Sequence, residues 1–282
     1  MRNGPNTRSM IFTIFGDYIR HDKHDIWIGS LIKLLKEFGH NEQSVRAAVS
    51  RMYKQGWLES RKNGNRSFYR LSPRGKARME EAGKRIFKLS PDQWDGKWRM
   101  FFYSIPEGKR NVREDLKKEL SWSGFGALSP NNWLTPNNLI KEAEYLIEKY
   151  ELADYVHLFT AQYEGAGENK SLVEACWDLS EINEKYTLFI DIYNKKFKEA
   201  RVKSNNGNIT LAKCFVEKTL LVHEYRKFLF IDPGLPAELL PEKWKGHAAA
   251  ALFSEYYKYL EGPAVAFYEQ IFNEGNVLKE KW

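Results

Sequence analysis

The sequence predicts an α+β chain in three parts, on the strength of three patterns. Residues 41–71 read as a helix followed by a two-stranded hairpin. Residues 97–165 alternate between strand-like and helix-like segments, whereas residues 170–282 show helical patterns alone. Because a chain of 282 residues usually holds more than one domain, we expect separate domains at 1–90, 97–165 and 170–282.

The first part begins with two expected helices. Apolar residues at helical spacing, among them Ile11 and Phe15, predict a helix over about residues 6–19. A short strand at Ile26-Trp27 then leads into a second helix over about residues 29–38, with leucines on its inner side. These helices precede a third, which carries the functional signal.

The third helix is predicted between Asn41, a good N-cap, and Gly56, which suits a left-handed C-cap. Its apolar side chains fall at positions i, i+3, i+4 and i+7 and form one buried stripe, so the opposite side is polar and cationic. The stripe comprises Val45, Ala48, Val49 and Met52, and the outer side carries Gln43, Arg46, Ala47, Ser50, Arg51 and Lys54.

A basic hairpin follows this helix. Two strand-like runs, WLESRKN and SFYRLS, flank an Asn63-Gly64 turn. Asn-Gly between such runs is a strong hairpin signal and favours a type I′ turn. Ser72-Pro73 then opens a closing helix that extends to about Phe87. The rim of the hairpin carries Arg61, Lys62, Asn65 and Arg66.

Two leading helices, a cationic third helix, a basic hairpin and a closing helix together indicate a winged helix-turn-helix, which reads DNA. The charge distribution agrees, since residues 1–90 carry a formal charge of +11 and the remaining residues carry −4. We therefore predict double-stranded DNA as a partner. The expected DNA-binding residues are Gln43, Arg46, Ser50, Arg51, Lys54, Lys62, Asn65 and Arg66. The neighbouring aromatic residues Tyr53, Trp57 and Trp27 are expected to lie in the domain core.

The middle part has the order β-α-β-β-α-β, which is the order of a ferredoxin-like domain. WRMFFYSI and YVHLFTAQY are the first and last strands, and residues 107–122 and 137–150 are the two helices. We interpret this domain as a dimerisation platform. One winged helix offers few base contacts, so a homodimer on two related half-sites is expected.

The last part combines long helices over residues 172–202 and 209–230 with the loop IDPGLPAELLPEKW and two further helices. The loop has two interpretations. In the first, the loop is a helix stop and reversal, which Pro233 and Gly234 produce in any chain. Alternatively, it forms a wall of an effector pocket, in which Arg226 faces a phosphate or carboxylate and Trp244 supplies an apolar surface.

Three segments carry a resemblance to a known family. They are VRAAVSRMYKQGWLESRKNGNRSFYRLSPRG, WRMFFYSIPEGKRNVREDLKKELSWSGFGALSPNNWLTP and FIDPGLPAELLPEKWKGHAAAALF. In this order they resemble the phenylacetic-acid degradation repressor (PaaX) family over nearly the whole chain. The resemblance implies a cytoplasmic bacterial repressor that binds operator DNA near aromatic-acid catabolic genes and releases it when phenylacetyl-coenzyme A binds. The residues proposed for contact with this effector are Arg226, Trp244 and His247, and no cofactor is expected.

Signals for an enzyme are weak. The sequence has no Gly-x-Ser-x-Gly, no phosphate-cradling glycine loop, no His-x-x-x-His and no Cys-x-x-Cys, so we predict neither catalytic nor metal-binding residues. The middle part also resembles the small CRISPR spacer-acquisition nucleases, whose first strand ends in a metal-binding Asp, but Ser104 stands at that place. A metal-dependent nuclease is the alternative function. An architectural DNA-binding protein is a third, which the large non-basic carboxy-terminal part disfavours.

Localisation follows from three absences in the sequence. No run of 18 uncharged apolar residues exists, so no membrane span is expected. The start, MRNGPNTRSMIFTIF, lacks the long apolar core and cleavage site of a signal peptide. Cys176 and Cys214 have no partner spacing, which favours two free thiols in a cytoplasmic protein.

Overall fold

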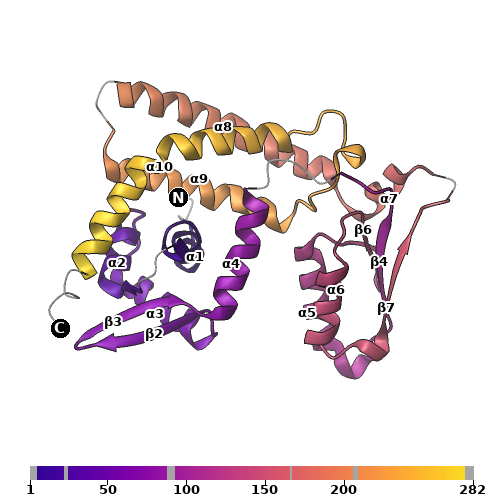
Figure 1. Ribbon diagram of the computed structural model, residues 1–282. Helices are drawn as coiled ribbons and strands as arrows, with labels where there is room; N and C mark the ends of the chain where they lie inside the picture. Colours follow the sequence, from indigo (N-terminus) through magenta and orange to yellow (C-terminus); the bar gives the residue numbers. More distant parts are fainter. Residues whose placement is uncertain (1–4, 22–24, 88–92, 166, 206–208, 277–282) are drawn as a thin grey trace. The chain divides into compact units, whose positions relative to one another are not determined.

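The computed structural model describes residues 5–21, 25–87, 93–165, 167–205 and 209–276 (Figure 1). The α+β class is confirmed, and the chain divides into two compact units. The first unit combines Met1–Phe87, Ile190–Arg226 and Ala250–Trp282, and the second combines Lys88–Phe189 and Lys227–Ala249. The carboxy-terminal part, which was expected to form a domain of its own, thus contributes to both units.

The amino-terminal part of the first unit is a winged helix. It contains the helices α1 (Thr7–Asp17), α2 (Ile28–Lys36), α3 (Glu42–Lys54) and α4 (Pro73–Ile86), and the strands β1 (Ile26–Trp27), β2 (Leu58–Asn63) and β3 (Arg66–Leu71). The strands form an antiparallel sheet in the order β1-β3-β2. The predicted cap of α3 is confirmed, because the Asn41 side chain accepts a hydrogen bond from the Ser44 backbone N–H at 2.8 Å.

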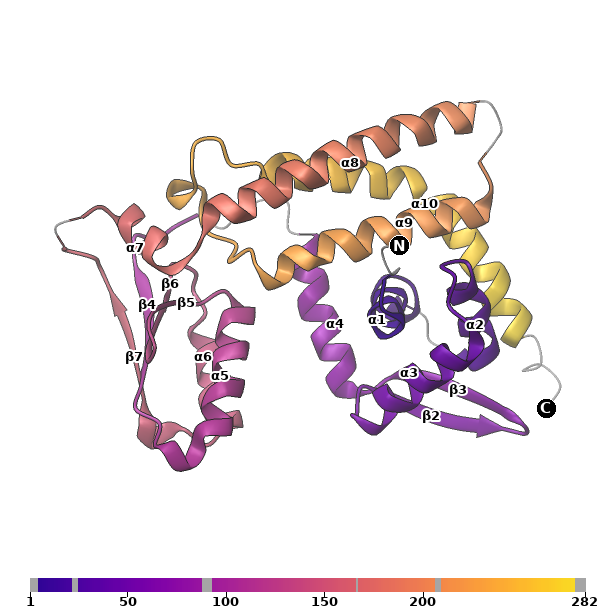
Figure 2. The same cartoon turned by 180° about the vertical axis from the view of Figure 1, so that it is seen from behind.

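Helix α9 (Leu211–Tyr225) packs beside α1 within the first unit (Figure 2). Three polar residues of α1, each four positions after the last, bond in succession to α9 and to Arg226, which caps its end. Arg226 donates to the Ser9 backbone oxygen at 3.0 Å, and Thr13 Oγ1 lies 3.0 Å from His223 Nδ1. Lys218 Nζ donates to Asp17 Oδ2 at 2.7 Å. The winged helix is therefore joined to a distant part of the chain by a buried polar interface.

The carboxy-terminal helices differ from expectation at three places. The helix expected over residues 172–202 is interrupted between α7 (Asn169–Cys176) and α8 (Leu179–Asn205), where the Asp178 side chain accepts from the Glu181 N–H and starts α8 anew. A 3₁₀ segment, Arg226–Phe230, follows the end of α9. The two helices expected at the end are one, α10 (Gly246–Asn276), which continues through Pro263. Despite these lengths, no helix in the described ranges is apolar enough to cross a membrane.

The second unit contains the ferredoxin-like domain. Its elements are β4 (Trp98–Tyr103), α5 (Arg110–Ser123), β5 (Gly126–Ser129), β6 (Asn132–Thr135), α6 (Ile140–Lys149) and β7 (Val156–Ala161). The strands form an antiparallel sheet in the order β5-β6-β4-β7. Helices α5 and α6 cover one face of this sheet (Figure 1), and Phe101, Trp133 and Leu116 belong to the core between the sheet and the helices.

The IDPGLP loop is held inside the second unit by hydrogen bonds. The Asn137 side chain donates to the Gly234 backbone oxygen at 3.1 Å, and the Tyr186 hydroxyl donates to Asp232 Oδ2 at 2.5 Å. The ring of Tyr186 also stacks on Phe228, with 3.9 Å between the ring centroids. These contacts give the loop a structural role as a helix stop and reversal.

Candidate nucleic-acid interface

Helix α3 separates its apolar and polar residues cleanly. The side chains of Val45, Ala48, Val49 and Met52 are at most 1% exposed, which confirms the buried stripe. The five DNA-binding residues predicted on this helix all lie on its exposed side: Gln43, Arg46, Ser50, Arg51 and Lys54. One helix thus presents amide, hydroxyl and cationic groups together, which are the groups that hydrogen-bond to base edges and phosphates.

The cations of α3 differ in their partners. Arg46 Nε donates to Glu42 Oε1 at 2.7 Å, in an exposed pair one turn apart. Within the described part of the chain, no residue forms an ion pair with Arg51 or Lys54. Unpaired surface cations lose little when they meet a phosphate, because no existing ion pair has to be broken. Arg51 and Lys54 are therefore best placed to bind DNA.

The turn at the tip of the wing differs from the expected one. Asn63 pairs with Arg66 in the ladder of β2 and β3, so the two loop residues are Gly64 and Asn65. Gly64 has a φ of +56°, whereas Asn65 is not among the residues with positive φ. A type I′ turn needs positive φ at both positions, but a type II′ turn needs it only at the first, where glycine is preferred. The predicted type I′ turn is therefore wrong, although the hairpin itself is confirmed.

The wing has fewer available cations than the sequence suggests. The Arg66 guanidinium lies 4.4 Å from the centre of the Trp27 ring and donates to the Gly275 backbone oxygen at 3.1 Å, so Arg66 is half-buried. Arg61 forms an ion pair with Asp25. Lys62 and Asn65 are exposed, and no described residue forms an ion pair with Lys62. Of the wing residues predicted to bind DNA, Lys62 and Asn65 are the accessible ones.

This division of roles gives a testable contrast. Lys62→Ala is expected to reduce the slope of log K against log salt for DNA binding by about 0.9, because one phosphate contact is lost. Its free energy of unfolding should change by less than about 0.5 kcal/mol. Arg66→Ala should instead lower that free energy by about 1–2 kcal/mol, because a cation–π contact and a hydrogen bond disappear. Urea unfolding measures the free energy of unfolding, and salt titrations of DNA binding measure the slope. Equal losses of stability in Lys62→Ala and Arg66→Ala would contradict the contrast.

Two aromatic residues near the wing behave differently from each other. Trp57 packs edge-on against Phe12, with 5.5 Å between the ring centroids, and the Arg74 guanidinium lies 4.6 Å from the centre of the Trp57 ring. Tyr53 is 51% exposed, so its expected place in the core is wrong. Position 53 lies outside the buried stripe of α3, at the edge of the polar side. The apolar character of the ring favoured a core position, whereas the helical register decides its exposure.

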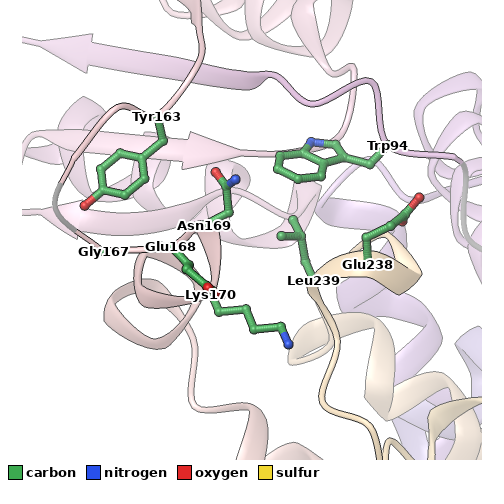
Figure 3. A pocket seen from close by; sticks show the side chains of 8 residues that line it. All are labelled: Trp94, Tyr163, Gly167, Glu168, Asn169, Lys170, Glu238 and Leu239. Carbon is green, nitrogen blue, oxygen red and sulfur yellow. The ribbon is translucent and has the colours of Figure 1, made fainter.

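The residues proposed for the effector belong to different units. Arg226 belongs to the first unit, where its guanidinium donates to Ser9, whereas Trp244 and His247 belong to the second. Trp244 packs edge-on against Tyr186 at 5.5 Å. A cavity of about 400 Å³ is present elsewhere in the second unit (Figure 3). It is lined by Trp94, Tyr163, Gly167, Glu168, Asn169, Lys170, Glu238 and Leu239.

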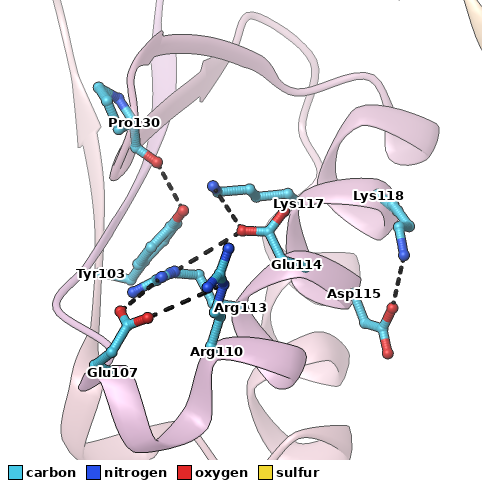
Figure 4. Close-up of polar contacts among 9 residues, drawn as sticks. All are labelled: Tyr103, Glu107, Arg110, Arg113, Glu114, Asp115, Lys117, Lys118 and Pro130. Carbon is cyan, nitrogen blue, oxygen red and sulfur yellow. Dashed lines mark hydrogen bonds and ion pairs between the residues drawn. The ribbon is translucent and has the colours of Figure 1, made fainter.

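The middle domain presents a different surface from that of α3. Its cationic side chains on α5 are paired, since Arg113 contacts Glu107 at 2.9 Å and Lys118 contacts Asp115 at 3.0 Å (Figure 4). Ser104 directly follows β4, at the position where the related nucleases carry a carboxylate. No cluster of three or more His, Cys, Asp or Glu side chains suited to a metal ion exists among the residues that the structure describes. The nuclease alternative thus lacks support from a metal site in this region.

The fold and the exposed cationic side of α3 define a winged-helix protein whose surface is suited to duplex DNA. Comparison with protein families agrees with this class. Residues 6–75 match the PaaX-like protein family, residues 91–173 match the PaaX protein central Cas2-like domain, and residues 177–270 match the PaaX-like protein C-terminal domain. The chain belongs to the PaaX family.

Two similar proteins extend this comparison. The transcriptional repressor PaaX of Escherichia coli (strain K12) is 36% identical over 263 residues, which cover 92% of this chain and 82% of that protein. The solved structure of the uncharacterized protein Rv0674 from Mycobacterium tuberculosis matches with a TM-score of 0.53 and 23% identity, covering 93% of this chain and 98% of that one. The first similarity indicates a regulator of transcription, and the second supports the fold.

Proposed function

We propose that this protein is a DNA-binding transcriptional repressor of phenylacetate catabolic genes. The observation that carries the proposal is the exposed side of α3, where Gln43, Arg51 and Lys54 face solvent together. Similarity to a transcriptional repressor over 92% of the chain supports the direction of regulation. In this proposal α3 lies in the major groove, and Lys62 and Asn65 of the wing contact the adjacent backbone.

The proposed repressor binds as a homodimer. A single α3 reaches only a few base pairs, so two copies on an inverted repeat are needed for specific binding. We assign dimerisation to the ferredoxin-like domain, since the exposed Phe159 on β7 packs against Phe102 on β4, with 5.5 Å between the ring centroids. The two rings form an apolar surface on the sheet of this domain. Light scattering of the full chain is expected to give twice its mass of 33.1 kDa. A monomer that still binds a single half-site tightly would contradict this assembly.

The proposed release signal is phenylacetyl-coenzyme A. A ligand shifts a two-state protein only by the difference between its affinities for the two states, and a large thioester has more groups for such differential contact than free phenylacetate. The cavity of the second unit supports this proposal, because the aromatic side chains of Trp94 and Tyr163 and the cation of Lys170 line it together. We propose this cavity in place of Arg226 for the acyl end, and Trp244 and His247 stay predictions for the remainder of the ligand.

A gel-shift titration tests the release. Phenylacetyl-coenzyme A, phenylacetate, coenzyme A and acetyl-coenzyme A are added at matched concentrations to the protein–DNA complex. Only phenylacetyl-coenzyme A is expected to release DNA, and Lys170→Ala should raise the concentration required by about tenfold, the effect of one lost charge-assisted hydrogen bond. Lys141→Ala, an exposed lysine on α6 outside the cavity, is the matched control. Release by free phenylacetate alone, or by none of the four compounds, would contradict the effector while the DNA-binding proposal would stand.

A further inference from the structure

Tyr53 occupies an unusual position on α3. All of α3 is described, and Tyr53 is its one large apolar side chain that is exposed. It lies seven residues after Arg46 and three after Ser50, so the three side chains follow one row along the helix surface. A large aromatic ring therefore lies beside the residues that face DNA in the proposed function.

The ring of Tyr53 lacks the contacts that its neighbour Trp57 makes. Trp57 packs against Phe12 and beneath Arg74. Among the described residues, none forms a hydrogen bond with the Tyr53 hydroxyl or an aromatic contact with its ring. The fold thus gains little from a tyrosine at this position, and the exposed ring is available to contact a ligand that approaches this side of α3.

We propose that Tyr53 determines part of the sequence specificity by packing its ring against a thymine methyl group in the major groove. This inference rests on the proposed DNA-binding function. The thymine C5-methyl is the apolar group that base edges present in the major groove, and apolar side chains are its usual contacts. The cations Arg51 and Lys54, which lack ion-pair partners in the described chain, serve guanine edges and phosphates. Tyr53 adds a contact of a different chemical kind.

The experiment removes the methyl group and the ring separately. A preferred duplex is selected from a random pool with the full-length protein, and each thymine in it is then replaced singly by uracil, which lacks the methyl. Dissociation constants are measured for the wild type, Tyr53→Ala and Tyr53→Phe. Tyr145→Ala is the matched control, because Tyr145 is 61% exposed on α6, which belongs to the ferredoxin-like domain and not to the winged helix.

At one or two thymines per half-site, uracil is expected to weaken wild-type binding by about fourfold, the value of one methyl group removed from an apolar contact. The same replacement should have no effect on Tyr53→Ala, because the two changes remove one interaction. Tyr53→Phe should behave as the wild type does, since it keeps the ring. Tyr145→Ala should leave every dissociation constant unchanged.

Three results would overturn the proposal. In the first, uracil leaves the dissociation constant of the wild type unchanged at every position. In the second, uracil and Tyr53→Ala weaken binding additively. In the third, Tyr53→Phe loses as much affinity as Tyr53→Ala, for selected and random duplexes alike. The last result would assign the hydroxyl to a phosphate. The proposed function has its own readout, which is the wild-type preference for the selected duplex over a random one. If that preference is present and the effects are additive, the role of Tyr53 alone fails.

Discussion

Lys218→Met is expected to lower the free energy of unfolding by about 3–5 kcal/mol, because it leaves a buried carboxylate without its counter-ion. The Lys218 ammonium group donates to Asp17 Oδ2 at 2.7 Å, and the two side chains are 1% and 3% exposed. The Tyr257 hydroxyl donates to the other Asp17 oxygen at 2.7 Å. After the substitution this hydroxyl is the one remaining side-chain donor to Asp17 within the described chain.

Burial removes the Lys218 ammonium group from water. Burial lowers the pKa of Lys218, and the nearby Asp17 carboxylate opposes that change. The rings of Tyr18 and Tyr257 lie 4.4 and 4.0 Å from the ammonium group and add cation–π attraction. Asp17 and the aromatic rings around the ammonium group therefore favour the charged form of the lysine, whereas burial disfavours it.

A double variant tests this account. Asp17→Asn with Lys218→Met removes both charges, so its loss of stability should be smaller than the sum of the two single losses. Lys213→Met is the control, because Lys213 is 53% exposed in its ion pair with Glu217. This substitution should lower the free energy of unfolding by less than about 1 kcal/mol. Urea unfolding of the full chain gives all four values. Additive losses would show that the two residues do not act as a pair.

Local elements of the winged helix could be predicted from the sequence because their signals are local. Asn41 caps α3, and Gly56 adopts a φ of +72° after its end, as expected from their residue types. The hydrophobic spacing identified the buried side of α3. The turn type was missed because the ladder extends to Asn63 and Arg66, which moves the loop by one residue.

Contacts between distant segments could not be predicted in this way. Asp17 and Lys218 are 201 residues apart, and neither position carries a pattern that distinguishes a buried charge from a solvated one. The position of Arg226 beside the IDPGLP loop suggests that it faces a phosphate or carboxylate, but its hydrogen bond to Ser9 depends on the packing of α9 against α1, which the sequence does not show. For the same reason, the sharing of the carboxy-terminal helices between two units has no signal in the local sequence.

The second large effect is expected on DNA binding. Arg51→Ala should weaken binding to the selected duplex by about 1–3 kcal/mol, with little loss on random DNA, if its guanidinium contacts a guanine edge. The loss of binding free energy should be smaller for Arg46→Ala than for Arg51→Ala by about 0.3–0.5 kcal/mol, because wild-type Arg46 has to give up its exposed ion pair with Glu42 when it binds DNA. The two variants thus separate an unpaired arginine from a paired one on the same helix.

The most direct test of DNA recognition by α3 is a paired titration of the full-length protein with the selected duplex and with a random duplex of equal length. Wild type, Arg51→Ala and the control Lys141→Ala, which changes an exposed lysine outside the winged helix, are measured at one fixed salt concentration. Recognition through α3 predicts a clear wild-type preference for the selected duplex, which Arg51→Ala reduces and Lys141→Ala preserves. Equal losses on both duplexes would assign Arg51 to phosphates. A wild-type protein that shows no preference, or an Arg51→Ala variant with unchanged affinity for both duplexes, would contradict recognition through α3.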